Sequence, residues 1–309
     1  MTAAAGSTRS GPAYYPGCSL DGMGRPYELS AQAVLHRLGL PLERIVEYNC
    51  CGATEVKNIS PDLSLVLPAR NLALAEAMGR SEVVAACNGC LYSLARANEA
   101  LVDPAARERI NARLREGGAP PYGGATEVRH LLDYIYRSAG VDAVRAAVVR
   151  PLKGIVVAPY YGCMYTRPKQ FTRANGRDGH EDPQEPMFLD ELLAACGATV
   201  VREYEAKTIC CGGGHALSDL EVSVGFSAAI LHAAQRAGAD LVATICPLGQ
   251  INIENHLERI AAKYGPEIIR PAAYFTQLMA LAFGSTVRAA RLADNFSRPD
   301  RLFRARGYP

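Results

Sequence analysis

Ten cysteines dominate the chemistry available to this 309-residue chain. Two pairs are vicinal, Cys50-Cys51 and Cys210-Cys211, and adjacent cysteines fit the geometry of a mutual disulfide badly. Residues 1–11 lack the charged region and apolar run of an export signal, so we expect a cytoplasmic protein. Structural disulfides are rare in the cytosol. The cysteines are therefore expected to be metal ligands or catalytic thiols.

The cysteines of the first half each follow a predicted strand and precede a predicted helix. They are Cys18, Cys50, Cys51, Cys87 and Cys90. Because ligand sites in open α/β sheets form at the carboxyl ends of the strands, these thiols are expected to converge on one pocket. The N-termini of the following helices favour thiolates and an anionic group. Gly17, Gly52 and Gly89 would let the backbone approach a bulky ligand.

The number of thiols limits what such a pocket binds. A structural zinc ion takes four ligands, and five thiols exceed that number. Thiolates also suit iron–sulfur clusters. An ordinary cubane cluster needs four cysteines as well, so five indicate something less common. The alternative is a set of buried free cysteines packed as small hydrophobic residues, which suits an isolated thiol better than a repeated set.

The chain also repeats itself weakly. Cys18 corresponds to Cys163, the first vicinal pair to the second, and Cys87 to Cys246, at separations of 145, 160 and 159 residues. Two copies of one half-domain explain this better than chance. We therefore expect a disordered arm at 1–12, a first cysteine-rich domain at 13–150, a second at 151–284 and an Arg-rich tail at 285–309.

The sequence alternates between short apolar runs, typical of strands, and segments with helical spacing of apolar residues. Short apolar runs predict strands at 13–15, 45–48, 83–86, 155–158, 199–201 and 241–245. Helical spacing places Ala31, Val34, Leu35 and Leu38 on one face, and Leu189, Leu192, Leu193 and Cys196 on another, which makes Cys196 a core residue. Segment 227–237 is Ala-rich and helical. The predicted fold class is α/β, with two similar half-domains, parallel sheets flanked by helices and a pseudo-twofold repeat.

Two segments interrupt this alternation. Residues 168–186 are polar and predict a long loop, either functional or a tolerated surface insertion. Residues 288–309 hold six arginines against two aspartates and either dock a partner or form a frayed end. The net charge of +2 implies no strong attraction to nucleic acid or acidic membranes. No apolar run reaches the length of a membrane span, so none is expected.

The cysteine spacing resembles that of a known family. Cys18 is followed by 31 residues, then by Cys50-Cys51, then by 35 residues that begin with Gly52, and then by Cys87-Asn88-Gly89-Cys90. This motif is similar to the cysteine-rich CCG domain in the B-type subunit of heterodisulfide reductase, and the likeness extends over nearly the whole chain. The resemblance implies that the five cysteines of the first half hold a non-cubane [4Fe-4S] cluster.

A second motif matches at Cys163, Cys210, Cys211 and Cys246, and the resemblance implies a second cluster there. Gly249 stands where the family usually has a fifth cysteine. Three outcomes are open: a cubane cluster on four thiolates, the family cluster with an open or replaced position, or another metal or nothing. We favour an iron–sulfur cluster, [4Fe-4S] of uncertain type, on the four cysteines.

Other residues near the cysteines carry weaker expectations. His215 lies close enough in sequence to replace the absent ligand or to move protons, although a surface histidine is the more ordinary interpretation. Tyr15, Tyr160 and Tyr161 either wall the pockets or belong to the core. Lys207 is expected to be a solvated charge.

The resemblance also implies an activity and partners. Relatives transfer electrons to a disulfide, and those electrons come from the ferredoxin-like and flavin-bearing subunits of the same complex. This chain has no compact C-x2-C-x2-C-x3-C run of its own, so a partner is implied. We expect an iron–sulfur catalytic subunit of a heterodisulfide reductase-like complex that acts on a disulfide or on sulfur carried by a thiol or protein. Sulfur oxidation is favoured, because the second motif departs from the methanogen pattern.

Two alternatives remain open. One is an electron-relay iron–sulfur subunit of an oxidase for glycolate or lactate. The other is a non-catalytic conduit subunit whose clusters hold a complex together. The substrate, the direction of electron flow, the stoichiometry of the complex and the occupant of the second site do not follow from the sequence.

Overall fold

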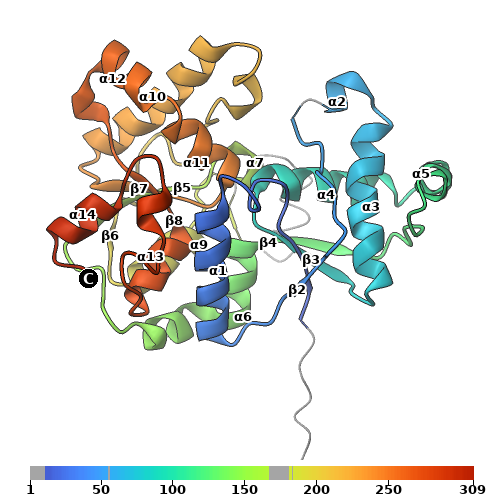
Figure 1. Ribbon diagram of the computed structural model, residues 1–309, viewed down its shortest axis with the longest axis horizontal. Coiled ribbons are helices and arrows are strands. Elements are labelled where there is room, and N and C mark those ends of the chain that lie inside the picture. The colour runs from blue at the N-terminus through green and yellow to red at the C-terminus, as the bar shows by residue number, and fades with distance from the viewer. Residues whose placement is uncertain (1–10, 55, 167–180, 183) are drawn as a thin grey trace, which may run out of the picture.

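The chain forms two four-stranded parallel sheets of the same topology. The computed structural model describes residues 11–54, 56–166, 181–182 and 184–309. The first sheet has the order β2-β1-β3-β4 and the second the order β6-β5-β7-β8 (Figure 1). The strands are β1 Ala13–Tyr15, β2 Glu43–Arg44, β3 Glu82–Ala85, β4 Glu127–His130, β5 Val156–Tyr160, β6 Thr199–Val200, β7 Leu241–Thr244 and β8 Ala272–Tyr274. The predicted fold class of two similar α/β half-domains is confirmed.

Helices flank both sheets. In the first half they are α1 Arg25–Leu38, α2 Val56–Ile59, α3 Leu63–Ala77, α4 Asn88–Ala100, α5 Pro104–Glu116 and α6 Leu131–Ala147. In the second half they are α7 Cys163–Thr166, α9 Phe188–Ala195, α10 Leu220–Arg236, α11 Pro247–Glu254, α12 Leu257–Tyr264, α13 Phe275–Ala282 and α14 Asp300–Ala305. Short 3-10 turns lie at Gly213–His215, Pro266–Ile268 and Leu292–Asp294. The three helical segments predicted from apolar spacing lie in α1, α9 and α10.

The predicted strand at 45–48 is wrong. The chain pairs with β1 two residues earlier, at β2, and the last ladder bond runs from Ile45 N–H to the Tyr14 carbonyl. Ile45 is buried, but Val46 is 84% exposed, because the chain then leaves the sheet toward the first vicinal pair. Two edge strands, β4 and β8, were not predicted from the sequence, because β4 has one apolar residue among four and β8 is mostly alanine.

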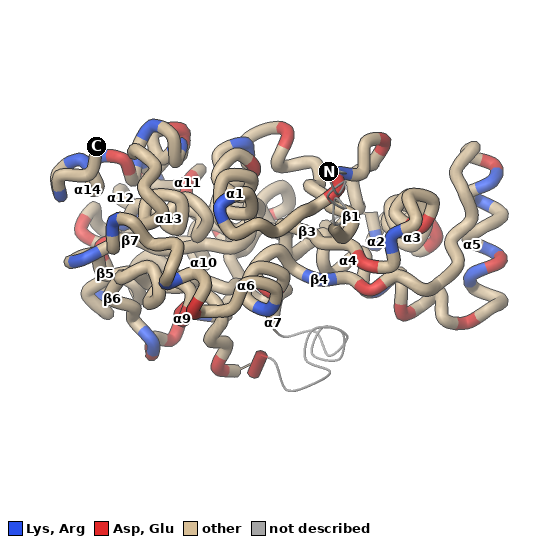
Figure 2. The backbone as a smooth tube through the Cα atoms, turned by 90° about the horizontal axis from the view of Figure 1, so that it is seen from below, with Lys and Arg blue, Asp and Glu red and all other residues tan. Residues whose placement is uncertain are grey.

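The two halves share a continuous core. α1 of the first half packs against α13 of the second, and α6 packs against α9. Tyr27 stacks on Tyr274 across this boundary, with ring centroids 4.5 Å apart. Figure 2 shows the halves side by side along the long axis, with α1 and α6 between them. The sheets are therefore fixed relative to one another by apolar contact, which also fixes the distance between their cysteine loops.

The Arg-rich tail packs onto the second half. Phe303 is fully buried, the Tyr308 hydroxyl donates to the Pro151 carbonyl at 3.0 Å, and the Arg306 guanidinium donates to the Gly154 carbonyl at 2.7 Å. The interpretation of this tail as a frayed end is wrong, because it contributes side chains to the core. The predicted arm at 1–12 and loop at 168–186 lie largely outside the described residues.

Candidate metal centre

The structure brings the five first-half cysteines together at the carboxyl ends of β1 and β3. The Cys50 and Cys18 sulfurs lie 3.7 Å apart, and the Cys51 and Cys90 sulfurs lie 3.4 Å apart. Cys87 and Cys90 face each other on the first turn of α4. Cys18 and Cys50 are exposed, whereas the other three are buried. The result is a cluster of thiols that is buried on one side and open to solvent on the other.

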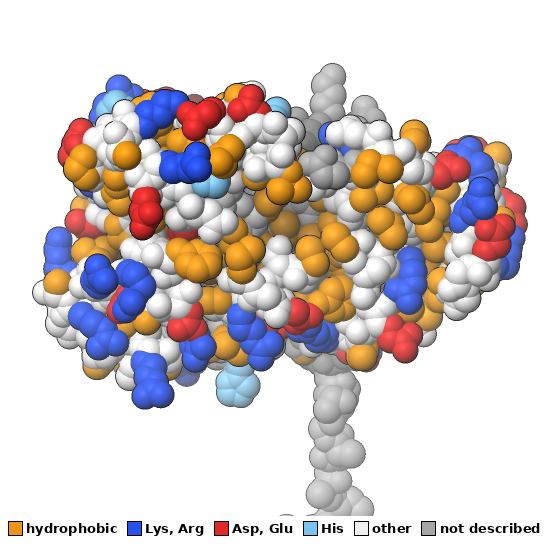
Figure 3. All heavy atoms as spheres, turned by 45° about the horizontal axis from the view of Figure 1, so that its top comes forward, with side chains coloured by type: hydrophobic (Ala, Val, Ile, Leu, Met, Phe, Trp, Pro, Cys, Tyr) orange, Lys and Arg blue, Asp and Glu red, His pale blue; other side chains and the backbone are white. Residues whose placement is uncertain are grey.

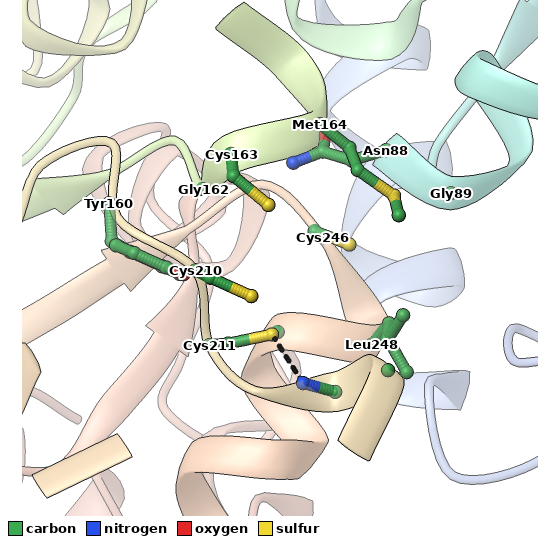
Figure 4. Close-up of a pocket in the computed structure, with 13 residues that line it drawn as sticks. Asn88, Gly89, Tyr160, Gly162, Cys163, Met164, Cys210, Cys211, Cys246 and Leu248 are labelled. Carbon is green, nitrogen blue, oxygen red and sulfur yellow. Dashed lines mark hydrogen bonds between the residues drawn. The ribbon is translucent and has the colours of Figure 1, made fainter. Parts of the chain in front are cut away.

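The second set of cysteines lines a small cavity of about 40 Å³ that is partly open to solvent. Figure 4 shows the sulfurs of Cys163, Cys210, Cys211 and Cys246 pointing into it. Cys210 hydrogen-bonds with the thiols of Cys163 and Cys211. These four predicted ligands thus meet at the equivalent edge of the second sheet.

The two sites touch. The sulfurs of Cys87 and Cys246, which occupy equivalent positions in the repeat, lie 3.8 Å apart and are both buried. Each is the N-cap residue of the helix that follows, with backbone angles of −124° and 132° at Cys87 and −130° and 122° at Cys246. The repeat therefore aims the same residue of both halves at a common boundary.

Matching hydrogen bonds hold both vicinal pairs. The Tyr15 hydroxyl donates to the Asn49 carbonyl at 2.8 Å, and the Tyr160 hydroxyl donates to the Ile209 carbonyl at 2.8 Å. Each accepting carbonyl belongs to the residue just before a vicinal pair. Both tyrosines are buried and border the cysteines, so they serve as pocket wall and core at once. Tyr161 instead points away, to Asp190.

The glycine after each vicinal pair completes its turn. The Gly52 amide donates to the Cys50 sulfur at 3.5 Å, and the Gly212 amide donates to the Cys210 sulfur at 3.2 Å. Both glycines have positive φ, 68° and 79°, a conformation that other residues adopt only with strain. The glycine of each Cys-Cys-Gly sequence thus allows the tight turn that places two neighbouring thiols in one site.

These contacts set the protonation of the thiols. Hydrogen bonding with the Cys18 and Cys51 thiols, together with the Gly52 amide, lowers the pKa of Cys50 to about 2. Hydrogen bonds from Cys163 and Cys211 lower the pKa of Cys210 to about 2 in the same way. One thiol of each vicinal pair is therefore held as the thiolate, which is the form that binds metals.

Other predicted residues lie as follows. Lys207 is not a solvated charge, because it is buried with its ammonium 2.7 Å from Asp190 Oδ1. Cys196 is confirmed as core, and burial raises its pKa to about 12. His215 is exposed beside Phe226 and contributes to lowering the pKa of Cys210. Its predicted role as a ligand or proton carrier stays a prediction.

Sequence reasoning missed three buried polar residues at the boundary between the sites. Asn88 Nδ2 donates to the Tyr161 carbonyl at 2.7 Å, and the Tyr27 hydroxyl donates to the Ile245 carbonyl at 3.0 Å. His130 Nδ1 accepts from the Leu132 amide, and burial lowers the pKa of His130 to about 4. Only Asn88 had a sequence signal, since it lies between two predicted ligands.

The donor set fits a bulky sulfur-loving group better than a single ion. Within the described ranges, no group of three or more His, Cys, Asp or Glu side chains is arranged to hold one metal ion. The pockets are lined by sulfur and by glycine, where larger residues would intrude: a Cβ on Gly17 would lie 2.8 Å from the Cys90 sulfur. Soft thiolates around such a space suit an iron–sulfur cluster.

Comparison with known proteins agrees with this geometry. The cysteine-rich CCG domain family matches residues 12–95 and 157–254. The B-type subunit of a ferredoxin/F(420)H(2)-dependent CoB-CoM heterodisulfide reductase from Methanosarcina acetivorans is 31% identical, over 87% of this chain and 88% of its own. The chain belongs to the family of heterodisulfide reductase B-type subunits. Its predicted membership is confirmed.

Another relative of this chain is named as a subunit of a different enzyme. The 8-methylmenaquinol:fumarate reductase membrane anchor subunit of Wolinella succinogenes is 33% identical, over 92% of this chain and 95% of its own. In the part of the chain that the structure describes, no helix has the length and apolar character needed to cross a bilayer.

A solved structure shares the fold. A hypothetical protein from Helicobacter pylori superposes with a TM-score of 0.72 at 15% identity, covering 94% of this chain. The match covers about half, 53%, of that longer chain.

Three exposed apolar side chains lie within six residues of a cysteine in the sequence. Met23, Val46 and Leu217 are 60%, 84% and 89% exposed, and they lie close in sequence to Cys18, Cys50 and Cys211 respectively. Figure 3 shows hydrophobic side chains spread through the middle of one face, with most of the charged side chains toward its margins.

Proposed function

We propose that this chain is the iron–sulfur electron-transfer subunit of a heterodisulfide reductase-like complex. It acts on a disulfide, or on sulfur carried by a small thiol or protein, with sulfur oxidation as the favoured direction. The observation that carries the proposal is the adjacency of the two thiol sets, whose Cys87 and Cys246 sulfurs lie 3.8 Å apart. Two one-electron sites side by side suit the two-electron chemistry of one sulfur–sulfur bond.

The residues divide between the two halves. In the first half Cys18, Cys50, Cys51, Cys87 and Cys90 would hold a non-cubane [4Fe-4S] cluster. In the second half Cys163, Cys210, Cys211 and Cys246 would hold a second iron–sulfur cluster. When bound, such clusters take up and release single electrons. Reduction of a disulfide consumes two electrons and two protons and yields two thiols, and oxidation reverses that balance.

The surrounding residues prepare the site. Tyr15 and Tyr160 fix the loops that carry the vicinal pairs, so the thiolates keep their positions when the group is absent. The buried Cys51, Cys87 and Cys90 exclude water from the floor, whereas Cys18 and Cys50 leave one side accessible.

A partner supplies or removes the electrons in this proposal. Met23, Val46 and Leu217, exposed and close in sequence to cysteines, support a docking partner, because exposed large apolar side chains favour association. A ferredoxin-like subunit would contact this surface, and a flavin-bearing subunit would exchange electrons with it in the cytoplasm.

A second candidate is an electron-relay subunit of a reductase or oxidase that acts on an organic acid. The observation favouring it is the 33% identity to a subunit of a fumarate reductase over nearly the full length of both chains. In that case electrons pass through the sites and no disulfide binds.

The test uses full-length protein purified without oxygen. Iron and acid-labile sulfide are measured per chain, with Cys87→Ser as control. Roughly eight irons with matching sulfide support two clusters and roughly four support one. Zinc without sulfide would contradict the proposal.

The chemically reduced protein is then mixed with a disulfide, and free thiols are counted. Release of two thiols per disulfide, lost in the Cys87→Ser variant, supports sulfur chemistry. Reduction of a quinone without thiol release supports the relay candidate instead.

A further inference from the structure

The two sheets end in equivalent residues beside the contact between the thiol sets. His130 is the last residue of β4, and Tyr274 is the last residue of β8. Each is paired in parallel register with the residue that lies two positions before a cysteine, Cys87 in one sheet and Cys246 in the other. The repeat therefore places one side chain from each half beside these two cysteine loops, although the residue types differ.

Both side chains are buried and carry a hydrogen-bond donor. His130 is 0% exposed and Tyr274 is 2% exposed. Nδ1 of His130 accepts from the Leu132 amide at 3.1 Å, so the proton of the neutral imidazole lies on Nε2. Among the described residues, no acceptor is aligned with this Nε2 or with the Tyr274 hydroxyl. Two such groups in one region indicate an acceptor that the side chains of the protein do not supply.

Electrostatic interactions connect both donors to the buried cysteines. Burial lowers the pKa of His130 to about 4, and the charge of Cys87 opposes this change. Burial raises the pKa of Tyr274 well above its usual range, and the charges of Glu254, Cys246 and Cys87 raise it further. The cysteine that acts on His130 thus belongs to the first site, and the one that acts most on Tyr274 belongs to the second.

An aromatic ring of the opposite half holds each donor in place. The Tyr165 ring meets His130 edge-on with ring centroids 5.3 Å apart, and the Tyr27 ring stacks on Tyr274 with ring centroids 4.5 Å apart. The Tyr27 hydroxyl in turn donates to the Ile245 carbonyl at 3.0 Å. Both donors are therefore fixed by packing, as the hydrogen bonds that support metal ligands need to be.

The contact beside these donors needs stabilisation. The Cys87 and Cys246 sulfurs lie 3.8 Å apart and are both buried. Sulfurs bind metal as thiolates, and like charges at this distance repel more strongly where water is absent. Hydrogen-bond donors reduce that repulsion. Asn88 Oδ1 is also without a partner among the described residues, but it is an acceptor and would not reduce it.

We propose that His130 and Tyr274 are positioning residues that donate hydrogen bonds to sulfur at the two sites, His130 Nε2 beside Cys87 and the Tyr274 hydroxyl beside Cys246. Each bond stabilises the more negative, reduced state and so raises the reduction potential of its site. Because an imidazole and a phenol differ as donors, the two sites take up electrons at different potentials. This inference rests on the proposed function, since it requires a redox-active group on these cysteines.

Tyr274→Phe tests the second half through the loss of one oxygen atom. Full-length protein is purified without oxygen, and its paramagnetic signals are followed during a reductive titration, with iron and sulfide measured per chain. We expect one signal to become about tenfold harder to reduce, a shift of about 59 mV to lower potential, with iron unchanged. Tyr134→Phe, whose hydroxyl donates to the Pro41 carbonyl at 2.9 Å, is the control and should leave both potentials unchanged.

Two variants of His130 separate hydrogen-bond donation from helix capping. His130→Asn keeps an acceptor for the Leu132 amide and loses the Nε2 donor, whereas His130→Gln carries an N–H near the position of Nε2 and loses the cap. We expect His130→Asn to lower the potential of the other signal and His130→Gln to stay near the wild-type value. The reverse order would show that only the cap matters and would overturn the inference.

Tyr274→Phe decides the inference even if a His130 variant fails to fold. Iron and sulfide retained in Tyr274→Phe with both potentials unchanged would overturn this inference alone. Wild-type protein without iron and sulfide would overturn the proposed function and this inference together.

Discussion

The two halves of the molecule share a topology, a pair of tyrosine hydrogen bonds and a Cys-Cys-Gly turn, yet they differ in their thiols. The first half presents five and the second presents four, because Gly249 replaces the counterpart of Cys90. The backbone at the helix start is unchanged by this replacement. The comparison teaches that the fold fixes the backbone position from which a ligand can come. The residue type at that position then decides whether a thiol is present.

The largest expected effect concerns the vicinal pairs. Cys51→Ser should remove the iron of the first half and Cys211→Ser that of the second, because each substitution takes a thiolate from one pocket only. We expect a loss of roughly four irons in each variant, measured with sulfide per chain. Cys196→Ala, a buried cysteine remote from both sets, serves as control and should keep its iron. Equal loss in all three variants would break the division into two sites.

The next effect separates a fully buried ion pair in the second half from a half-buried pair in the first. Lys207 and Asp190 side chains are 9% and 0% exposed, so Lys207→Met should lower the free energy of unfolding by about 3 kcal/mol. Arg44 is 36% exposed, and its partner Glu28 is buried but also accepts from Tyr14 and Gln32, so Arg44→Met should cost less, about 2 kcal/mol.

Chemical denaturation of the metal-free proteins measures both changes. Glu116→Gln, in a solvated pair with Arg113, is the control and should change little. A larger loss for Arg44→Met than for Lys207→Met would contradict the structure.

A third difference is the dependence of stability on pH. Burial raises the pKa of Glu254 to about 7, whereas the equivalent position of the first half is Ala95. Folding then favours the protonated carboxyl, so stability from this group is complete below the unfolded pKa near 4.5 and declines as pH rises to about 7. The decline should reach about 3 kcal/mol.

Unfolding free energies measured between pH 4.5 and 8 check this dependence. In Glu254→Gln this contribution should vanish while the rest of the profile remains. A wild-type profile identical to that of the variant would remove Glu254 as the cause.

The smallest effect should be the same in both halves. Tyr15→Phe and Tyr160→Phe each delete one hydroxyl that donates to a carbonyl at 2.8 Å. We expect each to lower the unfolding free energy by about 1 kcal/mol, because one buried hydrogen bond is lost. A large difference between the two would show that the repeat is not energetically symmetric.

Much of the fold could be predicted because its signals are local. Five of the six strands predicted from apolar runs overlap observed ones, and the α1 and α9 stripes face the core. β4 and β8 were missed because an edge strand three or four residues long carries little periodic signal. The strand at 45–48 failed because its apolar residues continue past the point where pairing ends.

The amino-acid sequence by itself determined the candidate ligands and the repeat. Residue type, the glycine after each vicinal pair and the spacing of strand ends are properties of short segments, and together they fix which thiols a half-domain gathers. The loss of the fifth thiol at Gly249 was visible at the same level.

Only the tertiary structure decided how the two halves meet. The 3.8 Å approach of Cys87 and Cys246, the burial of Lys207 and the unpartnered Asn88 oxygen beside the second cavity all arise where segments distant in sequence pack together. Such distances depend on the packing of α1 against α13 and of α6 against α9, and no local pattern encodes them.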